Sequence, residues 1–216
     1  MFAVREFTGD FETHLTVRPP GTRAEDERLG AWAADHGLKL TRIVLDRGAA
    51  PDQPMLTGRG SGGLGGQLAA ARRTARQLDA AGFPVIRTKI EAAPWNEDVP
   101  RTAAEALQLP PHCGFEHHVK LLLDEEEAVA AVRSVAEAHD AHVSRNARRG
   151  PRNGRHERFV TQRCHGVGRP EARRRLEALL AALSAAGFRY VEVEEEFVVH
   201  DDRPSVDAGW IVGAGR

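Results

Sequence analysis

Apolar and polar positions alternate along two short segments that lie about half a chain apart. Residues 11–17 read Phe-Glu-Thr-His-Leu-Thr-Val, and residues 115–121 read Phe-Glu-His-His-Val-Lys-Leu. Alternation with a period of two predicts strands with one apolar face and one polar face. Glu12 and Glu116 take the same place in the two segments, 104 positions apart. This match is the first sign of an internal repeat.

Three further landmarks recur in the same order and at nearly the same spacing. They are Leu-Thr-Gly-Arg at 56–59 and Val-Thr-Gln-Arg at 160–163, Ala-Gly-Phe at 81–83 and 186–188, and Arg-Gly at 47–48 and 149–150. A single match of this length would mean little, but four in one order predict a tandem duplication.

Helical patterns fill the intervals between these landmarks. Leu29, Trp32 and Ala33 form an apolar stripe in the first half, and Val132 and Val135 contribute to its counterpart in the second half. Each half therefore predicts strand, helix, strand, strand, helix, strand, which is the ferredoxin-like βαββαβ unit. We expect an α+β protein made of a first repeat at 1–95, a connector at 96–114, and a second repeat with a C-terminal tail at 115–216.

A unit of this kind covers one face of its sheet with two helices and leaves the other face open. Two such units can turn their open faces toward each other around a pseudo-twofold axis, or they can extend a single sheet side by side. We expect the first arrangement, a barrel or tunnel whose interior carries the polar strand positions.

Composition limits the classes of partner. The chain has 216 residues, a formal net charge of −1, 41% hydrophobic residues and 28% charged residues. A balanced charge does not favour nucleic acid or an anionic membrane surface. No apolar run approaches the ~20 residues of a membrane span, and the N-terminus lacks the apolar stretch of a signal peptide. We expect a cytoplasmic monomer or homodimer that binds a small anionic molecule.

The polar face of the two alternating strands carries the candidate chemistry. Glu12 and His14 lie two residues apart on one strand, as do Glu116 and His118 on the other. This spacing puts both side chains of a pair on one face, which a shared metal ion requires. The four residues are predicted to bind a divalent metal, Mg, Mn or Zn, or to act as catalytic acids and bases. The alternative is a pair of structural Glu–His hydrogen bonds.

Cationic side chains are predicted on the same face and would bind an anionic substrate: Arg59, Lys89, Lys120 and Arg163. In the last strand of each repeat, Arg87, Lys89 and Glu91 align with Glu192, Glu194 and Glu196. This complementarity predicts either ion pairs that dock the repeats or a polar cavity between them. Unpaired buried charges would be costly, so the space is expected to be wet or occupied.

The segment Phe-Glu116-His-His118-Val-Lys120-Leu resembles the Glu-x-Glu-x-Lys strand of the CYTH, or triphosphate tunnel metalloenzyme, superfamily. Glu116 and Lys120 match that pattern, and His118 stands in place of the second Glu. The resemblance covers one strand and a general architecture. It implies a tunnel of Glu, Arg and Lys side chains that handles triphosphates or organophosphates with a divalent metal.

Two functions remain open at this point. The first is a metal-dependent enzyme, such as a phosphohydrolase, that acts on a small phosphorylated substrate between the repeats. The alternative is a non-catalytic, pseudo-dimeric binding or scaffold protein. The glycine-rich segment 60–65 matches Gly-x-Gly-x-x-Gly but lacks the parallel βαβ context of a dinucleotide site, so a flexible loop is expected there.

Overall fold

The computed structural model describes residues 6–126, 128–149 and 155–210. The described strands are β1 (Thr8–Val17), β2 (Lys39–Leu45), β3 (Asp52–Gly63), β4 (Val85–Ala92), β5 (Gly114–Leu123), β6 (Ala141–Asn146), β7 (His156–His165) and β8 (Tyr190–Asp201). The helices are α1 (Arg23–Asp35), α2 (Leu64–Ala80), α3 (Ala103–Ala106), α4 (Ala128–Glu137) and α5 (Arg169–Ala185), with a 3₁₀ turn η1 (Pro204–Asp207).

All strands join one closed antiparallel barrel in the order β1-β3-β2-β6-β7-β5-β8-β4. The order within the first half is β2-β3-β1-β4, and the second half has the corresponding order β6-β7-β5-β8. The halves meet at two seams, β2 with β6 and β4 with β8. The mixed α+β class is therefore confirmed, and the polar strand faces enclose one interior.

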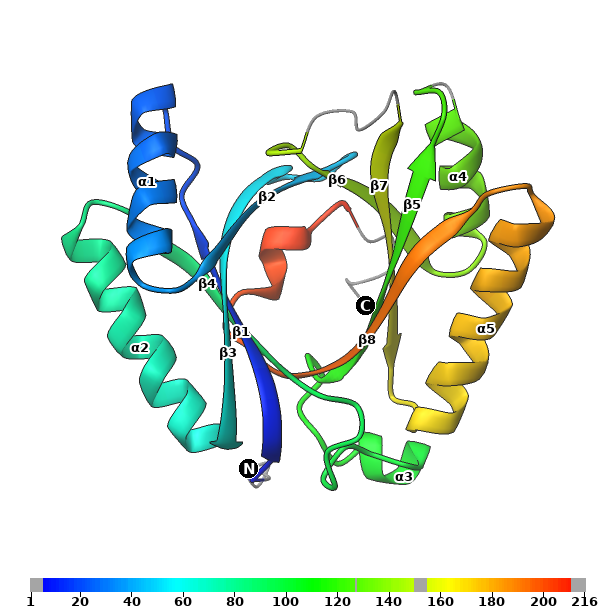
Figure 1. The fold of residues 1–216 in the computed structure, drawn as a ribbon. Helices are drawn as coiled ribbons and strands as arrows, with labels where there is room; N and C mark the ends of the chain where they lie inside the picture. Colours follow the sequence, from blue (N-terminus) through cyan, green and yellow to red (C-terminus); the bar gives the residue numbers. More distant parts are fainter. Residues whose placement is uncertain (1–5, 127, 150–154, 211–216) are drawn as a thin grey trace.

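The helices lie outside the barrel, with α1 and α2 against the first half and α4 and α5 against the second (Figure 1). Two apolar cores fill the layer between helices and strands. Phe11 and Leu15 of β1 join Leu29 and Leu78 in one core, whereas the other includes Val119, Leu121, Val143, Val160, Leu176, Leu179 and Leu183. Because the apolar residues are buried on the outer side of the strands, the inner side is free to carry polar groups.

Local signals set the helix ends as expected. Thr22 caps α1, where its hydroxyl accepts from the Glu25 amide while the Glu25 carboxylate accepts from the Thr22 amide. Gly82 and Gly187 follow α2 and α5 with φ of 89° and 83°, a conformation that glycine adopts without strain.

The expectation of a flexible loop at residues 60–65 is wrong. Residues up to Gly63 belong to β3 because β1 pairs with them as far as Thr8 opposite Gly63, and α2 begins at Leu64. The glycines thus extend a strand directly into a helix.

Two segments outside the two four-stranded halves pack against the barrel. The segment between β4 and β5 carries α3, and its backbone at Arg101 lies so close to Gly168 that a Cβ there would stand 2.2 Å from the Arg101 oxygen. The C-terminal turn η1 enters the ring of strands (Figure 1) and brings the buried Asp207 and Trp210 inside. No helix in the described part of the chain is both long and apolar enough to cross a bilayer.

Candidate functional site

A cavity of about 240 Å³ lies inside the barrel. All eight residues that the sequence singled out line it: Glu12, His14, Arg59, Lys89, Glu116, His118, Lys120 and Arg163. Strand alternation explains this placement, because each of them occupies a position that points away from the helices. The structure thus brings together the candidate residues of both halves, whose chemical roles remain predictions.

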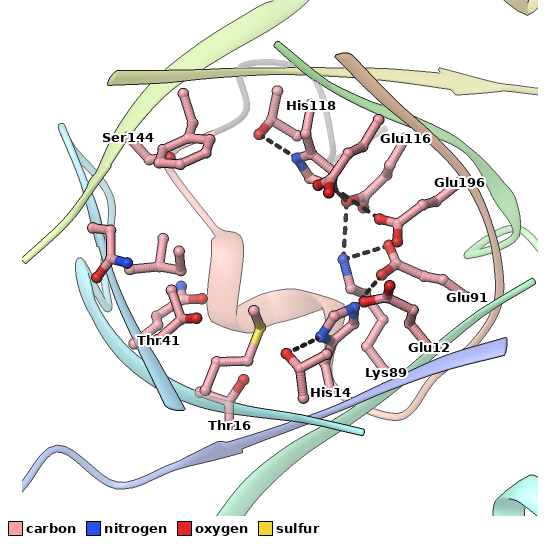
Figure 2. Close-up of a pocket in the computed structure, with 18 of the residues that line it drawn as sticks. Glu12, His14, Thr16, Thr41, Lys89, Glu91, Glu116, His118, Ser144 and Glu196 are labelled. Atoms are coloured by element: carbon pink, nitrogen blue, oxygen red, sulfur yellow. Dashed lines mark hydrogen bonds and ion pairs between the residues drawn. The ribbon is translucent and has the colours of Figure 1, made fainter. Parts of the chain in front are cut away.

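The cavity has two unlike walls (Figure 2). The wall formed by β1, β4, β5 and β8 carries the glutamates and histidines. The opposite wall, from β2, β3, β6, β7 and the C-terminal segment, offers hydroxyls and amides together with apolar side chains: Ile43, Leu45, Met55, Phe159 and Trp210. This second wall is mixed rather than apolar, because it also carries the charged side chains of Lys39, Arg59 and Arg163. A molecule inside the barrel would therefore meet carboxylates and imidazoles on one side and a mixture of cationic, polar and apolar groups on the other.

Each half builds a chain of three side chains across neighbouring strands, here called a Thr–His–Glu relay. In the first relay, a hydrogen bond of 2.9 Å joins the His14 Nδ1 to the Thr57 hydroxyl, and the His14 Nε2 lies 2.5 Å from the Glu91 Oε2. The strand register explains the contact, because His14 on β1 is directly opposite Thr57 on β3.

The second relay repeats the first at equivalent positions. The His118 Nδ1 is 3.0 Å from the Thr161 hydroxyl, and its Nε2 lies 3.3 Å from the Glu196 Oε2. His118 and Thr161 are again directly opposite, on β5 and β7. In both relays the threonine fixes one imidazole nitrogen, so the other nitrogen faces the carboxylates of the cavity.

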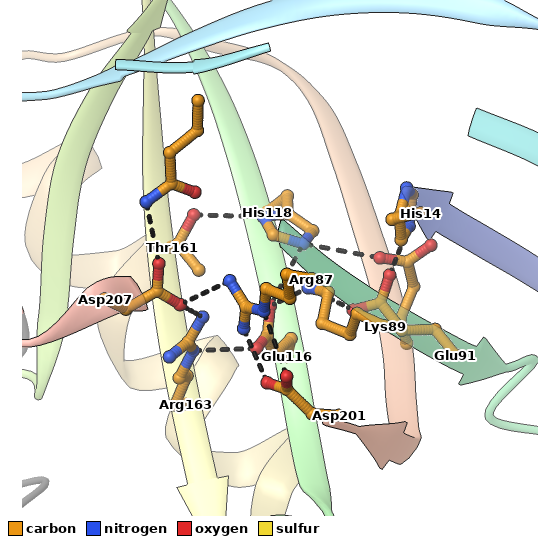
Figure 3. Close-up of polar contacts among 12 residues, drawn as sticks. His14, Arg87, Lys89, Glu91, Glu116, His118, Thr161, Arg163, Asp201 and Asp207 are labelled. Atoms are coloured by element: carbon orange, nitrogen blue, oxygen red, sulfur yellow. Dashed lines mark hydrogen bonds and ion pairs between the residues drawn. The ribbon is translucent and has the colours of Figure 1, made fainter. Parts of the chain in front are cut away.

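Deeper in the barrel the charges form a continuous network (Figure 3). The Lys89 ammonium lies 2.8 Å from Glu91 and 2.9 Å from Glu116. Arg163 lies 2.7 Å from both Glu116 and Asp207. Lys89 and Arg163, which the sequence predicted as substrate ligands, are thus already matched by carboxylates of the chain.

Arg87 extends this network to the C-terminal segment. It forms ion pairs of 2.6 Å with Asp201 and 2.9 Å with Asp207. The sequence left open whether Arg87 and Lys89 form ion pairs with Glu192, Glu194 and Glu196 or line a polar cavity with them. All five line the cavity, and in the described residues both cations pair with other carboxylates. The strand β4 instead pairs with β8 so that Lys89 stands opposite Asp201, and the tail supplies the remaining carboxylate.

Three further cations of the cavity have ion pairs that are longer or more exposed than those of this network. The Arg59 side chain is 78% exposed and binds Glu12 at 2.6 Å. Lys120 reaches Glu157 and Glu192 only at 3.5 Å each, and Arg149 lines the same cavity. The side chains of Arg59 and Arg149 are 78% and 48% exposed, so a solute can reach them directly.

The buried charges perturb one another strongly. Burial alone would raise the pKa of Glu116, but Arg163 and Lys89 outweigh it and lower that pKa to about 2. The pKa of Glu91 is likewise held well below its ordinary value, since Lys89 and His14 outweigh its burial. These two carboxylates are ionised at neutral pH.

Glu196 behaves differently, because burial and the negative charge of Glu91 raise its pKa. Burial lowers the pKa of His118, but the hydrogen bond and charge of Glu196 and the nearby Glu116 raise it overall. The second relay therefore retains protons more readily than isolated side chains would. It is suited to proton transfer or to exchange of its proton for a cation.

Two groups of side chains could hold a metal ion, with potential ligand atoms within 4.8 Å of one another. One contains Glu12, His14 and Glu196, and the other contains Glu91, His118 and Glu196. Three of the four predicted ligands belong to these groups, but Glu116 does not and is instead paired with Lys89 and Arg163.

Sequence reasoning placed Glu91 and Glu196 on the cavity face but did not recognise them as ligands. Both follow the repeat, since they are 105 positions apart. The β1–β4 pairing of Glu12 with Glu91 and the β5–β8 pairing of Glu116 with Glu196 bring them to the relays. The repeat offset was a signal that could have found them.

No protein-family model matches this chain, and no curated protein matches its sequence. One solved structure to which it is similar is described as "putative glycine cleavage system transcriptional repressor", with 13% sequence identity and a TM-score of 0.27. That match covers 88% of this chain and 96% of the other. A TM-score of this size does not establish a shared fold.

Proposed function

We propose that this protein binds a small charged molecule inside its barrel. The observation that carries the proposal is the cavity itself, in which glutamates and histidines of both halves meet on one wall and cationic, polar and apolar side chains form the other. Such a concave site with a few oriented polar groups is what a small-molecule ligand needs. A scaffold protein would gain nothing from leaving this space open.

The ligand we propose carries an anionic group, with phosphate as the leading class. Lys89 and Arg163 are already neutralised by carboxylates of the protein. The anion would therefore bind to the other cations of the cavity, Arg59, Lys120 and Arg149. The ion pairs of Lys120 and Arg149 have longer N–O distances than those of the buried network, and the pair of Arg59 with Glu12 is more exposed to solvent. Guanidinium and ammonium groups in a partly closed site bind phosphate oxygens by charge-assisted hydrogen bonds.

The same proposal includes the origin of the barrel. We propose that residues 1–95 and 115–216 are copies of one ferredoxin-like unit related by a pseudo-twofold axis, joined by the connector at 96–114. The equal strand order of the halves and the equivalent relays support this. The CYTH resemblance also remains a proposal, supported by a closed barrel in which Glu116 and Lys120 line the interior.

A second candidate function is catalysis, specifically metal-dependent phosphohydrolysis. The two Thr–His–Glu relays favour it, because an imidazole fixed on one nitrogen and facing a carboxylate on the other is a competent general acid or base. In this candidate, His14 would move protons, and His118 with the neighbouring glutamates would hold a divalent ion, which would supply an activated water when bound.

Thermal unfolding with a panel of solutes tests the binding proposal. Inorganic triphosphate, phosphate monoesters, dicarboxylates and amino acids would each be added in the presence of EDTA. At a concentration of ~100 times Kd, a bound ligand stabilises the fold by about 2.7 kcal/mol. We expect Lys120→Met to lose most of this stabilisation, whereas Arg72→Met, a charge removed from the exposed outer side of α2, retains it.

Two outcomes would contradict the proposals separately. If no anionic solute raises the melting temperature, or if both variants respond as the unchanged chain does, anion binding in the barrel is wrong. If an anion binds but no phosphate is released from triphosphates with Mg²⁺ or Mn²⁺, the catalytic candidate is wrong and the binding proposal stands.

A further inference from the structure

The carboxylate of Glu91 is one of the buried cavity groups that keep unused hydrogen-bonding capacity. Its residue is 1% exposed, and neither of its oxygens forms a well-angled hydrogen bond within the described residues. Lys89 and His14 lie within ion-pair distance but do not provide that geometry. Lys89 and His14 compensate the charge of this buried anion, and a carboxylate with ~4 lone-pair sites keeps acceptor capacity for one more cation.

A second carboxylate and an imidazole point to the same place. Potential ligand atoms of Glu91, His118 and Glu196 lie within 4.8 Å of one another. The His118 Nε2 and the Glu196 Oε2 are 3.3 Å apart. Ligand atoms bound at ~2.1 Å around a tetrahedral ion stand roughly 3.4 Å from each other, so this pair already has the separation of two metal ligands.

We infer that Glu91, His118 and Glu196 bind one divalent transition-metal ion per chain. Three protein ligands would leave a further coordination position for water or a solute. Glu12 and His14 approach Glu196 from the other half, so the ion would lie where the two halves meet. The Nε2 of His14 is 2.5 Å from Glu91, a hydrogen-bond distance that leaves no room for an ion between them. His118 is therefore the histidine ligand.

The mixture of nitrogen and oxygen donors selects the kind of metal. Imidazole together with carboxylates suits Zn²⁺, Mn²⁺, Co²⁺ or Ni²⁺, whereas Mg²⁺ and Ca²⁺ favour oxygen ligands alone. The hydrogen bond between the His118 Nδ1 and Thr161 would fix the ring with Nε2 free for the metal. Outer contacts of this kind commonly raise metal affinity.

This inference does not depend on the proposed anionic ligand, because the metal contacts side chains alone. Isothermal titration of the full-length chain, stripped with EDTA and dialysed, measures it with Zn²⁺, Co²⁺ and Mg²⁺ in the absence of any phosphate. We expect one Zn²⁺ or Co²⁺ per chain and at least 10-fold weaker Mg²⁺ binding. The visible absorption of bound Co²⁺ reports coordination by imidazole and carboxylate.

Variants locate the ion. Glu196→Gln and His118→Gln are each expected to weaken Zn²⁺ binding by ~100-fold or more, the upper end of what loss of an outer contact costs. Glu194→Gln is the matched control, since Glu194 lines the cavity from the same strand but belongs to neither ligand group. Thr161→Val keeps every ligand and should weaken binding by ~10-fold.

The inference is overturned if the stripped chain binds no Zn²⁺ or Co²⁺. It is also overturned if Glu196→Gln and His118→Gln bind them unchanged, or if Glu194→Gln loses as much affinity as they do. Circular dichroism and thermal unfolding establish that each variant is folded. Thermal shifts with anions in EDTA are recorded on the same samples, so failure of metal binding and failure of anion binding are separate results.

Discussion

Replacement of Asp207 by Asn tests whether the C-terminal segment is anchored by charge. The Asp207 side chain is 4% exposed and accepts hydrogen bonds from Arg87 at 2.9 Å, Arg163 at 2.7 Å and Gln53 at 3.0 Å. Loss of one partner from a buried ion network costs ~3–5 kcal/mol, because the opposite charges stay buried. Arg87 keeps Asp201 and Arg163 keeps Glu116, so we expect the lower end, about 3 kcal/mol.

Thermal unfolding measures this loss. In a chain of this length ~1 kcal/mol shifts the melting temperature by ~2–4 °C, so Asp207→Asn should lower it by roughly 6–12 °C. The control is Asp124→Asn, which also removes an Asp–Arg pair, but one in which the aspartate side chain is 77% exposed. Exposed pairs contribute ~0–1 kcal/mol. Equal melting temperatures for the two variants would refute the argument that burial gives the Asp207 network its strength.

Three further predictions concern separate parts of the molecule. Because the pKa of Glu116 is lowered, its contribution to stability is present above its unfolded pKa of ~4.3 and is lost as pH falls toward about 2. Urea unfolding from pH 6 to 2 should show this loss, and the free energy of unfolding should change less steeply with pH in Glu116→Gln. Gly66→Ala, in open space on α2, should stabilise the protein by ~0.5–1 kcal/mol, whereas Gly168→Ala should destabilise it because its Cβ meets the Arg101 backbone; urea unfolding at neutral pH compares the two. Thr22→Ala should cost ~1 kcal/mol through loss of the α1 cap, and an unchanged unfolding midpoint would contradict the capping role.

The positions that face the interior could be predicted from the sequence because strand alternation is a local rule. Phe11 and Leu15 are buried in the outer core, while Glu12 and His14 between them line the cavity. The sequence match between the two halves then predicted the same inward and outward positions for the second half, without any knowledge of the tertiary structure. The sequence thus predicted which residues line the candidate site, but not which of them contact one another.

The contacts depend on features that no local pattern contains. Arg87 binds Asp201 and Asp207, which lie 114 and 120 positions further along the chain. These pairs require the β4–β8 seam and the path of the tail, and both form only when the barrel closes. The same holds for Glu91 and Glu196, whose proximity follows from that seam. Sequence reasoning could place each charge on a face but could not choose its partner.

Differences between the halves explain why the cavity opens at one end. The relays are alike in both halves, but Arg87 and Lys89 of β4 correspond to Glu192 and Glu194 of β8. The cationic pair is neutralised by the tail and the barrel, and the Arg87 side chain is only 5% exposed. Glu192, in contrast, is 53% exposed and reaches Lys120 only at 3.5 Å. Among the described residues, the tail that neutralises one half has no counterpart at the other. The second relay is also the more exposed of the two, with the His118 side chain at 24% against 9% for His14. Lys120 stands directly opposite Glu192 on the neighbouring strand, so an anion that reaches this half finds a cation beside its most exposed glutamate.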